Sequence, residues 1–309
     1  MKFFVNSGNR YFIDSIKEYK VYSDKTRKYE KLKFGELDNS IKNSNKIYDK
    51  VLLFPVTDIN NLWHLIQYMY VTYKYNKNKN LNVEIIYPII VYKKYMKRIN
   101  LSNLLYKDFL FKGLGFNYSK FEEIREIFKQ DKYITINNLY VSNELINFKS
   151  DKLIFNFKSK ILNNFGVDIN NKKENKKVTF IMRKGIRSIS NMDYVKNKLN
   201  YFNINYVYME NYSIDKQLKI VSNSDILIGT HGSGLTWSIF MKPKSTLIEI
   251  LPNKVLNDNY VILCDISNIN YVKLYAQGEN FGDHEGFGWK HASIILNDNN
   301  IEFIKNKLK

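Results

Sequence analysis

The chain has 309 residues, 44% of them hydrophobic, so it can bury the core of one large or two medium domains. Its single cysteine, Cys264, excludes an internal disulfide framework and a cysteine metal cluster. A formal net charge of +18 would suit a polyanionic partner. Because the basic residues are mostly scattered lysines without a nucleic-acid-binding motif, a solvated basic surface is favoured over a specific nucleic-acid site.

The sequence has no window that approaches the roughly 20 apolar residues of a membrane-spanning helix. The N-terminal stretch MKFFVNSGNRYF is a poor secretory signal, because polar residues interrupt its short apolar part. We therefore expect a soluble, cytoplasmic protein without a signal peptide or a membrane span.

The first half of the chain predicts strands alternating with helices. Short strands are expected within residues 1–45, and the apolar run 51–56 predicts a buried strand. From Asn61 the apolar residues recur at helical spacing, so His64 lies near the start of a helix that follows a loop containing Asp58. We then expect strands at 82–90 and 133–141, and helices within 92–111, at 121–130 and at 151–165.

The second half follows a polar segment, 170–177, which is the best candidate linker. Strands and helices alternate after it, which predicts a parallel sheet covered on both faces. We therefore expect two Rossmann-like α/β domains, residues 1–169 and 178–309, with the last helix, 299–308, a candidate to pack back on the first domain. The expected strands are 178–182, 204–209, 226–228, 246–251, 258–265, 271–275 and 293–296, the expected helices are 192–199, 213–222 and 235–241, and 278–289 is expected to be a loop.

The most informative stretch is the glycine-rich turn GTHGSG, residues 229–234, between a short apolar strand and a helix. Glycines allow the backbone to approach a ligand closely, and the N–H groups at a helix start favour phosphate. A plain strand-to-helix turn explains the spacing equally well, because the stretch is neither a Walker loop nor the dinucleotide fingerprint. His231 inside the turn and Glu249 inside the next strand are polar residues in unusual places, which indicates a ligand.

The segment GTHGSGLTWSIFMKPKSTLIEILP resembles the signature of glycosyltransferase family 61, in which G-x-H-G-A-G-L-T-N-x-x-F-M-x-P precedes a strand ending in E-I-x-P. This chain has Ser233 in place of the usual alanine and Trp237 in place of the usual asparagine. Two further stretches agree with the family in order: KVTFIMRKGIRSISN, through Arg183, Arg187 and Asn191, and INNLWHLIQYMY, through Asn61 and His64.

The resemblance implies a GT-B architecture, in which two Rossmann-like domains face a cleft. It also implies transfer of a sugar, N-acetylglucosamine or xylose in this family, from a UDP-sugar to a hydroxyl of a protein or glycan acceptor, with inversion. We expect no cofactor and no essential metal, because no D-x-D pair stands at a strand end. The residues expected on the donor side are Arg183, Arg187, Asn191, Thr230, His231, Gly232, Ser233, Gly234, Leu235 and Glu249, and Asn61 is expected on the acceptor side.

The donor-side roles follow from the chemistry of a sugar nucleotide. Backbone N–H groups of residues 232–235 and a donor on His231 would hold the diphosphate, and Glu249 would accept from the ribose hydroxyls. Arg183 and Arg187 can make forked contacts with phosphate, although a solvated arginine turn explains them as well.

The general base is less well defined. His64, with Asp58 behind it, is the candidate, but a lone histidine beside an apolar helix face is more often structural. Family members commonly carry an aspartate three or four residues later, where this chain has Gln67 and Tyr68, and a neutral amide does not accept the proton. Three hypotheses stay open: an active transferase, an inactive relative that binds nucleotide or glycan, and a nucleic-acid-binding protein, which salt-dependent DNA binding without UDP binding would identify.

Overall fold

The computed structural model describes residues 47–53, 62–85, 101–118, 133–141, 153–168, 176–252, 257–279 and 292–309, and between residues 3 and 35 the backbone of the strands alone. The chain divides into two compact units, Met1–Asn147 and Phe148–Lys309.

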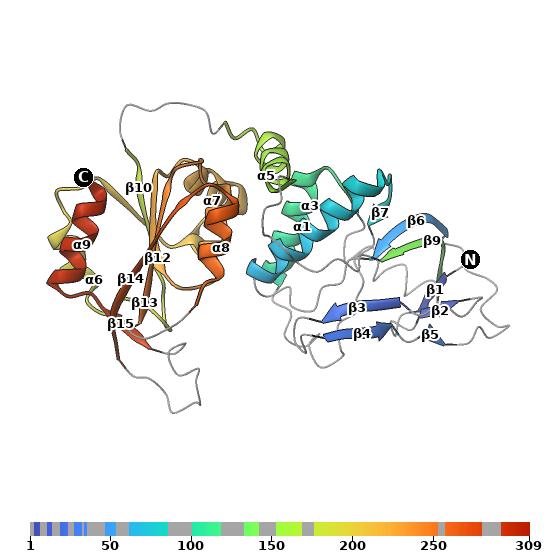
Figure 1. Ribbon diagram of the computed structural model, residues 1–309, viewed down its shortest axis with the longest axis horizontal. Coiled ribbons are helices and arrows are strands. Elements are labelled where there is room, and N and C mark those ends of the chain that lie inside the picture. The colour runs from blue at the N-terminus through green and yellow to red at the C-terminus, as the bar shows by residue number, and fades with distance from the viewer. Residues whose placement is uncertain are drawn as a thin grey trace. The chain divides into compact units, whose positions relative to one another are not determined.

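The first unit contains a mixed sheet in the order β5-β2-β1-β9-β6-β7-β8, with β3 and β4 as a separate antiparallel pair (Figure 1). The helices in its described part are α1 (Leu62–Lys79) and α3 (Leu101–Leu114), and α1 confirms the helix predicted from Asn61. The strands are β1 (Phe3–Asn6), β2 (Tyr11–Ile13), β3 (Tyr19–Ser23), β4 (Lys28–Leu32), β5 (Phe34–Gly35), β6 (Ile47–Leu53), β7 (Glu84–Ile85), β8 (Asn117–Tyr118) and β9 (Tyr133–Val141).

This sheet corrects the expectation of two Rossmann-like domains. β6 pairs in parallel with β7 and β9, as in a Rossmann-like sheet, but β1 pairs antiparallel with both β2 and β9. The connection from β1 to β2 is too short for the crossover of a dozen or more residues that parallel neighbours need, so the two strands form a hairpin. The described part of the chain therefore has one clearly Rossmann-like sheet, and it lies in the second unit.

The second unit is built on a sheet in the order β11-β10-β12-β13-β14-β15 (Figure 1). Every neighbouring pair is parallel except β14 and β15. The strands are β10 (Val178–Ile181), β11 (Ile204–Val207), β12 (Ile226–Thr230), β13 (Thr246–Pro252), β14 (Asn270–Glu279) and β15 (Ser293–Ile295).

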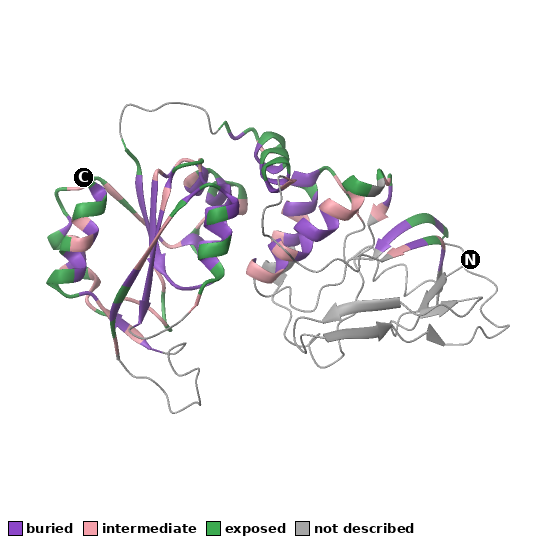
Figure 2. Cartoon of the chain, viewed as in Figure 1, coloured by how far each residue is buried: buried purple, intermediate pink, exposed green. Residues whose placement is uncertain are grey.

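Helices cover both faces of this sheet, and its inner strands β10, β12 and β13 are almost entirely buried (Figure 2). Successive side chains of a strand point to opposite faces, so Ile248 and Ile250 of β13 join one core while Glu249 faces the other way. Helices α6 (Met192–Lys198) and α9 (Asp298–Leu308) supply residues to the core of Ile248 and Ile250. The last helix therefore packs on the second sheet, whereas the sequence made it a candidate to pack back on the first domain.

The other face carries α7 (Ile214–Ser222), the 3₁₀ helix η3 (Ser233–Phe240) and α8 (Asn259–Ile266), with a short 3₁₀ turn, η2 (Met209–Asn211), after β11. The strand expected at 258–265 is wrong, because this segment is α8. Its buried residues Tyr260, Leu263 and Cys264 recur at helical spacing. This spacing cannot be recognised in the sequence, because the apolar run is continuous.

The helix α5 (Leu153–Asn164) belongs to the second unit. Its buried Lys158 donates a hydrogen bond from Nζ to the backbone oxygen of Met241, directly after η3. Most of the candidate linker 170–177 lies outside the described residues, as do the helix expected at 121–130 and most of the loop expected at 278–289.

Candidate functional site

The order of the strands in the second unit defines where a ligand can bind. The chain runs from β10 to β11 on one side and later places β12 on the other side of β10, so the topology reverses between β10 and β12. In an open parallel sheet, ligands bind outside the carboxyl ends of the strands at such a reversal. Arg183 comes shortly after the carboxyl end of β10, and His231 directly follows β12.

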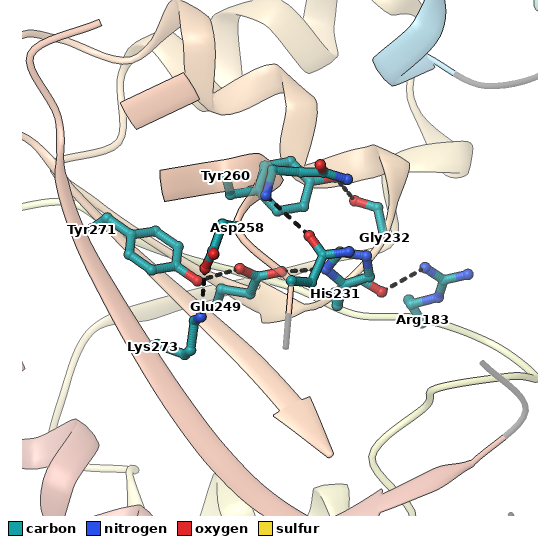
Figure 3. A network of polar contacts seen from close by, with 10 residues as sticks. Arg183, His231, Gly232, Glu249, Asp258, Tyr260, Tyr271 and Lys273 are labelled. Carbon is teal, nitrogen blue, oxygen red and sulfur yellow. Dashed lines mark hydrogen bonds and ion pairs between the residues drawn. The ribbon is translucent and has the colours of Figure 1, made fainter. Parts of the chain in front are cut away.

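Arg183 and the glycine-rich turn lie against each other at this reversal. The guanidinium Nη1 of Arg183 donates to the backbone oxygen of His231 at 3.3 Å (Figure 3). The Arg183 side chain is half-buried, and burial lowers its pKa from the ordinary value. One edge of the guanidinium is thus fixed by the protein, and a planar fork of this kind can bind an anion with its remaining N–H groups.

A chain of hydrogen bonds continues from His231 into the sheet (Figure 3). Nδ1 of His231 contacts Oε1 of Glu249, and the Tyr271 hydroxyl donates to Oε2 of Glu249 at 2.5 Å. Glu249 is 0% exposed. Both of its oxygens are therefore engaged inside the protein, where a ribose does not reach them, and the arrangement supports a role in holding His231.

Tyr260 of α8 closes the inner side of the turn. Its hydroxyl donates to the backbone oxygen of Gly232 at 2.5 Å, and its ring meets the ring of His231 edge-on with centroids 5.5 Å apart. Burial raises the pKa of Tyr260, so the hydroxyl keeps its proton and acts as a donor. Sequence reasoning missed both Tyr260 and Tyr271.

A second arginine lies on the loop of residues 183–191, here called the arginine loop. The backbone of Arg187 has φ of 59°, in the left-handed region that costs a non-glycine residue about 1 kcal/mol or more. Burial lowers the pKa of Arg187 to about 10, and the positive charge of Arg183 adds to the effect. Two half-buried guanidinium groups that disfavour each other's charge form a site that a bound anion would stabilise.

Asn191 has a different position from the one expected for a donor-binding residue. Its side-chain Nδ2 donates to the backbone oxygen of Leu296 at 2.8 Å, and its Oδ1 accepts from the Leu296 N–H at 3.2 Å. The backbone N–H of Arg187 likewise donates to Ala292 at 2.9 Å. The arginine loop is therefore fastened at both points to the segment around β15.

The remaining residues of the turn and of η3 differ in their surroundings. Thr230 is buried at the end of β12, whereas Ser233 is exposed. The serine that replaces the family's usual alanine at position 233 therefore meets no packing constraint. The backbone N–H of Leu235 already donates to Gly232 at 2.9 Å within the first turn of η3. Trp237 points into the core, where its Nε1 donates to Oε1 of Gln217 at 3.0 Å. The tryptophan that stands in place of the usual asparagine therefore contributes to the packing of the core.

The residues expected on the acceptor side belong to the first unit. His64 and Gln67 are half-buried on α1, and Tyr68 is buried beside them. Asp58 and Asn61 lie outside the described residues.

A parallel sheet with a histidine and two arginines at its topological reversal defines an α/β protein that can bind an anionic group there. The model of the family Glycosyltransferase 61 matches residues 56–248, which is more than half of the chain. The chain therefore belongs to glycosyltransferase family 61. A search of the curated proteins found no match.

Two solved structures resemble the chain at low identity. One is the iron-containing dodecameric glycosyltransferase TibC from enterotoxigenic E. coli H10407, with 10% identity, 99% of this chain and 92% of that chain covered, and a TM-score of 0.39. The other is the E. coli heptosyltransferase WaaC with ADP, with 6% identity, 84% and 100% covered, and a TM-score of 0.33. At these scores the likeness carries no inference about this chain.

Within the described residues, no helix combines the length and apolar character that crossing a bilayer would require.

Proposed function

We propose that this glycosyltransferase moves a sugar, N-acetylglucosamine or xylose, from a UDP-sugar to a hydroxyl of a protein or glycan, with inversion at the anomeric carbon. The observation that carries the proposal is the meeting of Arg183 and His231 at the reversal between β10 and β12. The diphosphate of the donor would bind there, against the guanidinium groups of Arg183 and Arg187 and the imidazole of His231.

The proposed reaction is a single displacement. The acceptor oxygen forms a bond to the anomeric carbon while the bond from that carbon to the phosphate oxygen breaks, and the electron pair stays on the diphosphate. Positive charge and N–H groups held in place before the reaction stabilise this developing charge. The acceptor proton passes to a general base, for which we propose His64, with Asp58 behind it.

The architecture that goes with this proposal is GT-B, with the second unit binding the donor and the first unit binding the acceptor through the region of Asn61. A cytoplasmic location and a two-domain arrangement remain part of the same proposal, with the division after Asn147 rather than at the candidate linker 170–177. Partners other than the donor and the acceptor are not needed for it.

The proposal is tested by calorimetric titration of the full chain with UDP, GDP, CMP and UDP-sugars. Selective UDP binding is expected, and replacing the forked guanidinium in Arg183→Ala should weaken it by about tenfold or more, as for a lost hydrogen bond to a charged group. Lys184→Ala is the matched control, because Lys184 is the exposed neighbour of Arg183. Absence of UDP binding by the wild type, or equal losses in both variants, would contradict the proposal.

An inactive relative that binds nucleotide is the second candidate, and Gln67, where the family often has aspartate, is the observation that favours it. UDP binding without transfer to any of a panel of glycan and peptide acceptors, and without hydrolysis of the UDP-sugar, would identify this case.

A further inference from the structure

A fully buried carboxylate requires a physical reason, because removing a charge from water is costly unless it is paired and hydrogen-bonded. Glu249 lies in β13, an inner strand of the sheet, and is 0% exposed. Its neighbours in register are Gly229 of β12 and Lys273 of β14. The side chain thus lies on the face of the sheet that η3 and α8 cover, and its two oxygens contact His231 and Tyr271.

The direction of these hydrogen bonds follows from Tyr271. Burial first, and the nearby Glu249 second, raise the pKa of the Tyr271 hydroxyl far above its usual range. The hydroxyl is therefore protonated throughout the working pH range, and it donates to Oε2 of Glu249. The other oxygen, Oε1, is held at Nδ1 of His231, with one proton between the two atoms.

From this geometry we infer that Tyr271 is a positioning residue: its hydroxyl orients the Glu249 carboxylate so that Oε1 holds Nδ1 of His231. Nε2 is then the ring nitrogen that faces a donor phosphate, and it donates to the phosphate when the ring carries a proton on both nitrogens. The inference deepens the proposed function and rests on it for the identity of the ligand. The internal chain from Tyr271 to His231 exists in the protein alone, so it can be tested without a ligand.

The edge-on contact of Tyr260 against the His231 ring supports the same orientation from another side. Because Glu249 fixes Nδ1, the imidazole cannot rotate to present the other nitrogen without breaking a buried contact. A ring held in this way loses little freedom when a ligand binds, which is the benefit of preorganisation.

The test compares Tyr271→Phe with Tyr275→Phe in the full chain. Tyr275 lies on the same face of β14 and is 39% exposed. The control variant Tyr275→Phe loses one hydroxyl, just as Tyr271→Phe does. Two-bond proton–nitrogen spectra of histidine-labelled protein show which imidazole nitrogen carries the proton, and the His231 signal is assigned from its loss in a His231→Asn variant. In Tyr271→Phe we expect the His231 nitrogens to change from one protonation pattern to a mixture, and UDP affinity to fall by about tenfold.

Glu249→Gln provides a second variant that keeps the shape of the side chain. If Tyr271 donates to the amide oxygen, the amide NH₂ must face Nδ1 of His231, and the imidazole proton moves to Nε2. The double variant Tyr271→Phe with Glu249→Gln frees the amide to turn, and both tautomers should then appear.

Two results would overturn the inference. The first is a His231 spectrum in Tyr271→Phe identical to that of the wild type and of Tyr275→Phe. The second is a Glu249→Gln spectrum in which the proton stays on Nδ1 whether or not Tyr271 is present. Failure of the wild type to bind UDP would instead contradict the proposed function, and the spectra of the unliganded protein would still decide the role of Tyr271.

Discussion

Nη1 of Arg183 lies 1.8 Å from the point where a side-chain Cβ on Gly232 would be. The guanidinium thus fills the space that any other residue at this position would need. In Gly232→Ala the methyl group must displace the flexible end of Arg183, which removes its hydrogen bond to His231 and misplaces the charge. We expect UDP affinity to fall by about tenfold, measured by calorimetry, with little change in the melting temperature.

Gly234→Ala is the control for this prediction, because a Cβ on Gly234 meets nothing within 4 Å. The mechanism also predicts that the effect of Gly232→Ala disappears when Arg183 is already alanine, since neighbouring residues that act through one contact are not additive. Equal losses in the Arg183 and Arg183→Ala backgrounds would show that Gly232 acts through something else, such as its own backbone.

Asn191→Ala should lower the stability of the fold more than the binding of the donor. Both side-chain atoms of Asn191 are hydrogen-bonded to Leu296, so the variant leaves two backbone groups without their partner, at about 1–3 kcal/mol of unfolding free energy. Urea denaturation measures this loss. An unchanged denaturation curve together with a fall in UDP affinity as large as that of Arg183→Ala would instead place Asn191 in direct contact with the donor.

Transfer activity should survive an excess of chelator. In the proposed mechanism arginine, histidine and backbone N–H groups neutralise the diphosphate, so a divalent ion is not required. Initial rates with and without EDTA, after dialysis against EDTA, should agree within error. Loss of transfer that Mg²⁺ or Mn²⁺ restores would disprove the prediction.

His64→Ala should abolish sugar transfer and leave UDP binding unchanged. A general base contributes typically about a hundredfold to ten-thousandfold to the rate, and its removal acts on the acceptor proton alone. Rates and UDP titrations of the same preparation separate the two effects. Turnover equal to that of the wild type would remove His64 from the mechanism.

The unfolding free energy should rise between pH 8 and pH 10 because of Lys158. Burial lowers the pKa of Lys158 from 10.5 to about 8, so in this range the unfolded chain binds more protons than the folded one. Stability then increases with pH, by at most about 2 kcal/mol from this group. Urea denaturation across the range measures the slope, and Lys158→Met should flatten it. A wild-type curve parallel to that of Lys158→Met would show that Lys158 is not the source.

Sequence reasoning predicted the second unit well because its signals are local. Alternating apolar runs and helical periods defined the strands from β10 to β13, and the glycine-rich turn marked the end of β12. His231 in the glycine-rich turn and Glu249 in an apolar strand stand out in the sequence as polar residues in unusual places. Their mutual contact depends on the register of β12 and β13, which a single sequence does not determine.

Other features depend on contacts that no local pattern encodes. The chain has 24 tyrosines, so nothing in the sequence distinguishes Tyr260 and Tyr271 from the rest. The sequence predicts that Glu249 accepts from a ribose, whereas the structure buries its carboxylate beneath η3 and α8. The sequence does not indicate this cover, because it predicts a strand where α8 forms. In the first unit, the order of the sheet follows from pairing between β1 and β9, which lie far apart in the sequence.

The bond from Asn191 to Leu296 spans 105 positions, and it joins the arginine loop to a segment that is synthesised much later. Because a ribosome makes the chain from its N-terminus, Arg183, Arg187 and the glycine-rich turn all precede the strand that fastens their loop. A nascent chain that stops before residue 292 lacks that fastening. Assembly of the anion site is therefore a late event in biosynthesis, and partial products of translation should not retain UDP.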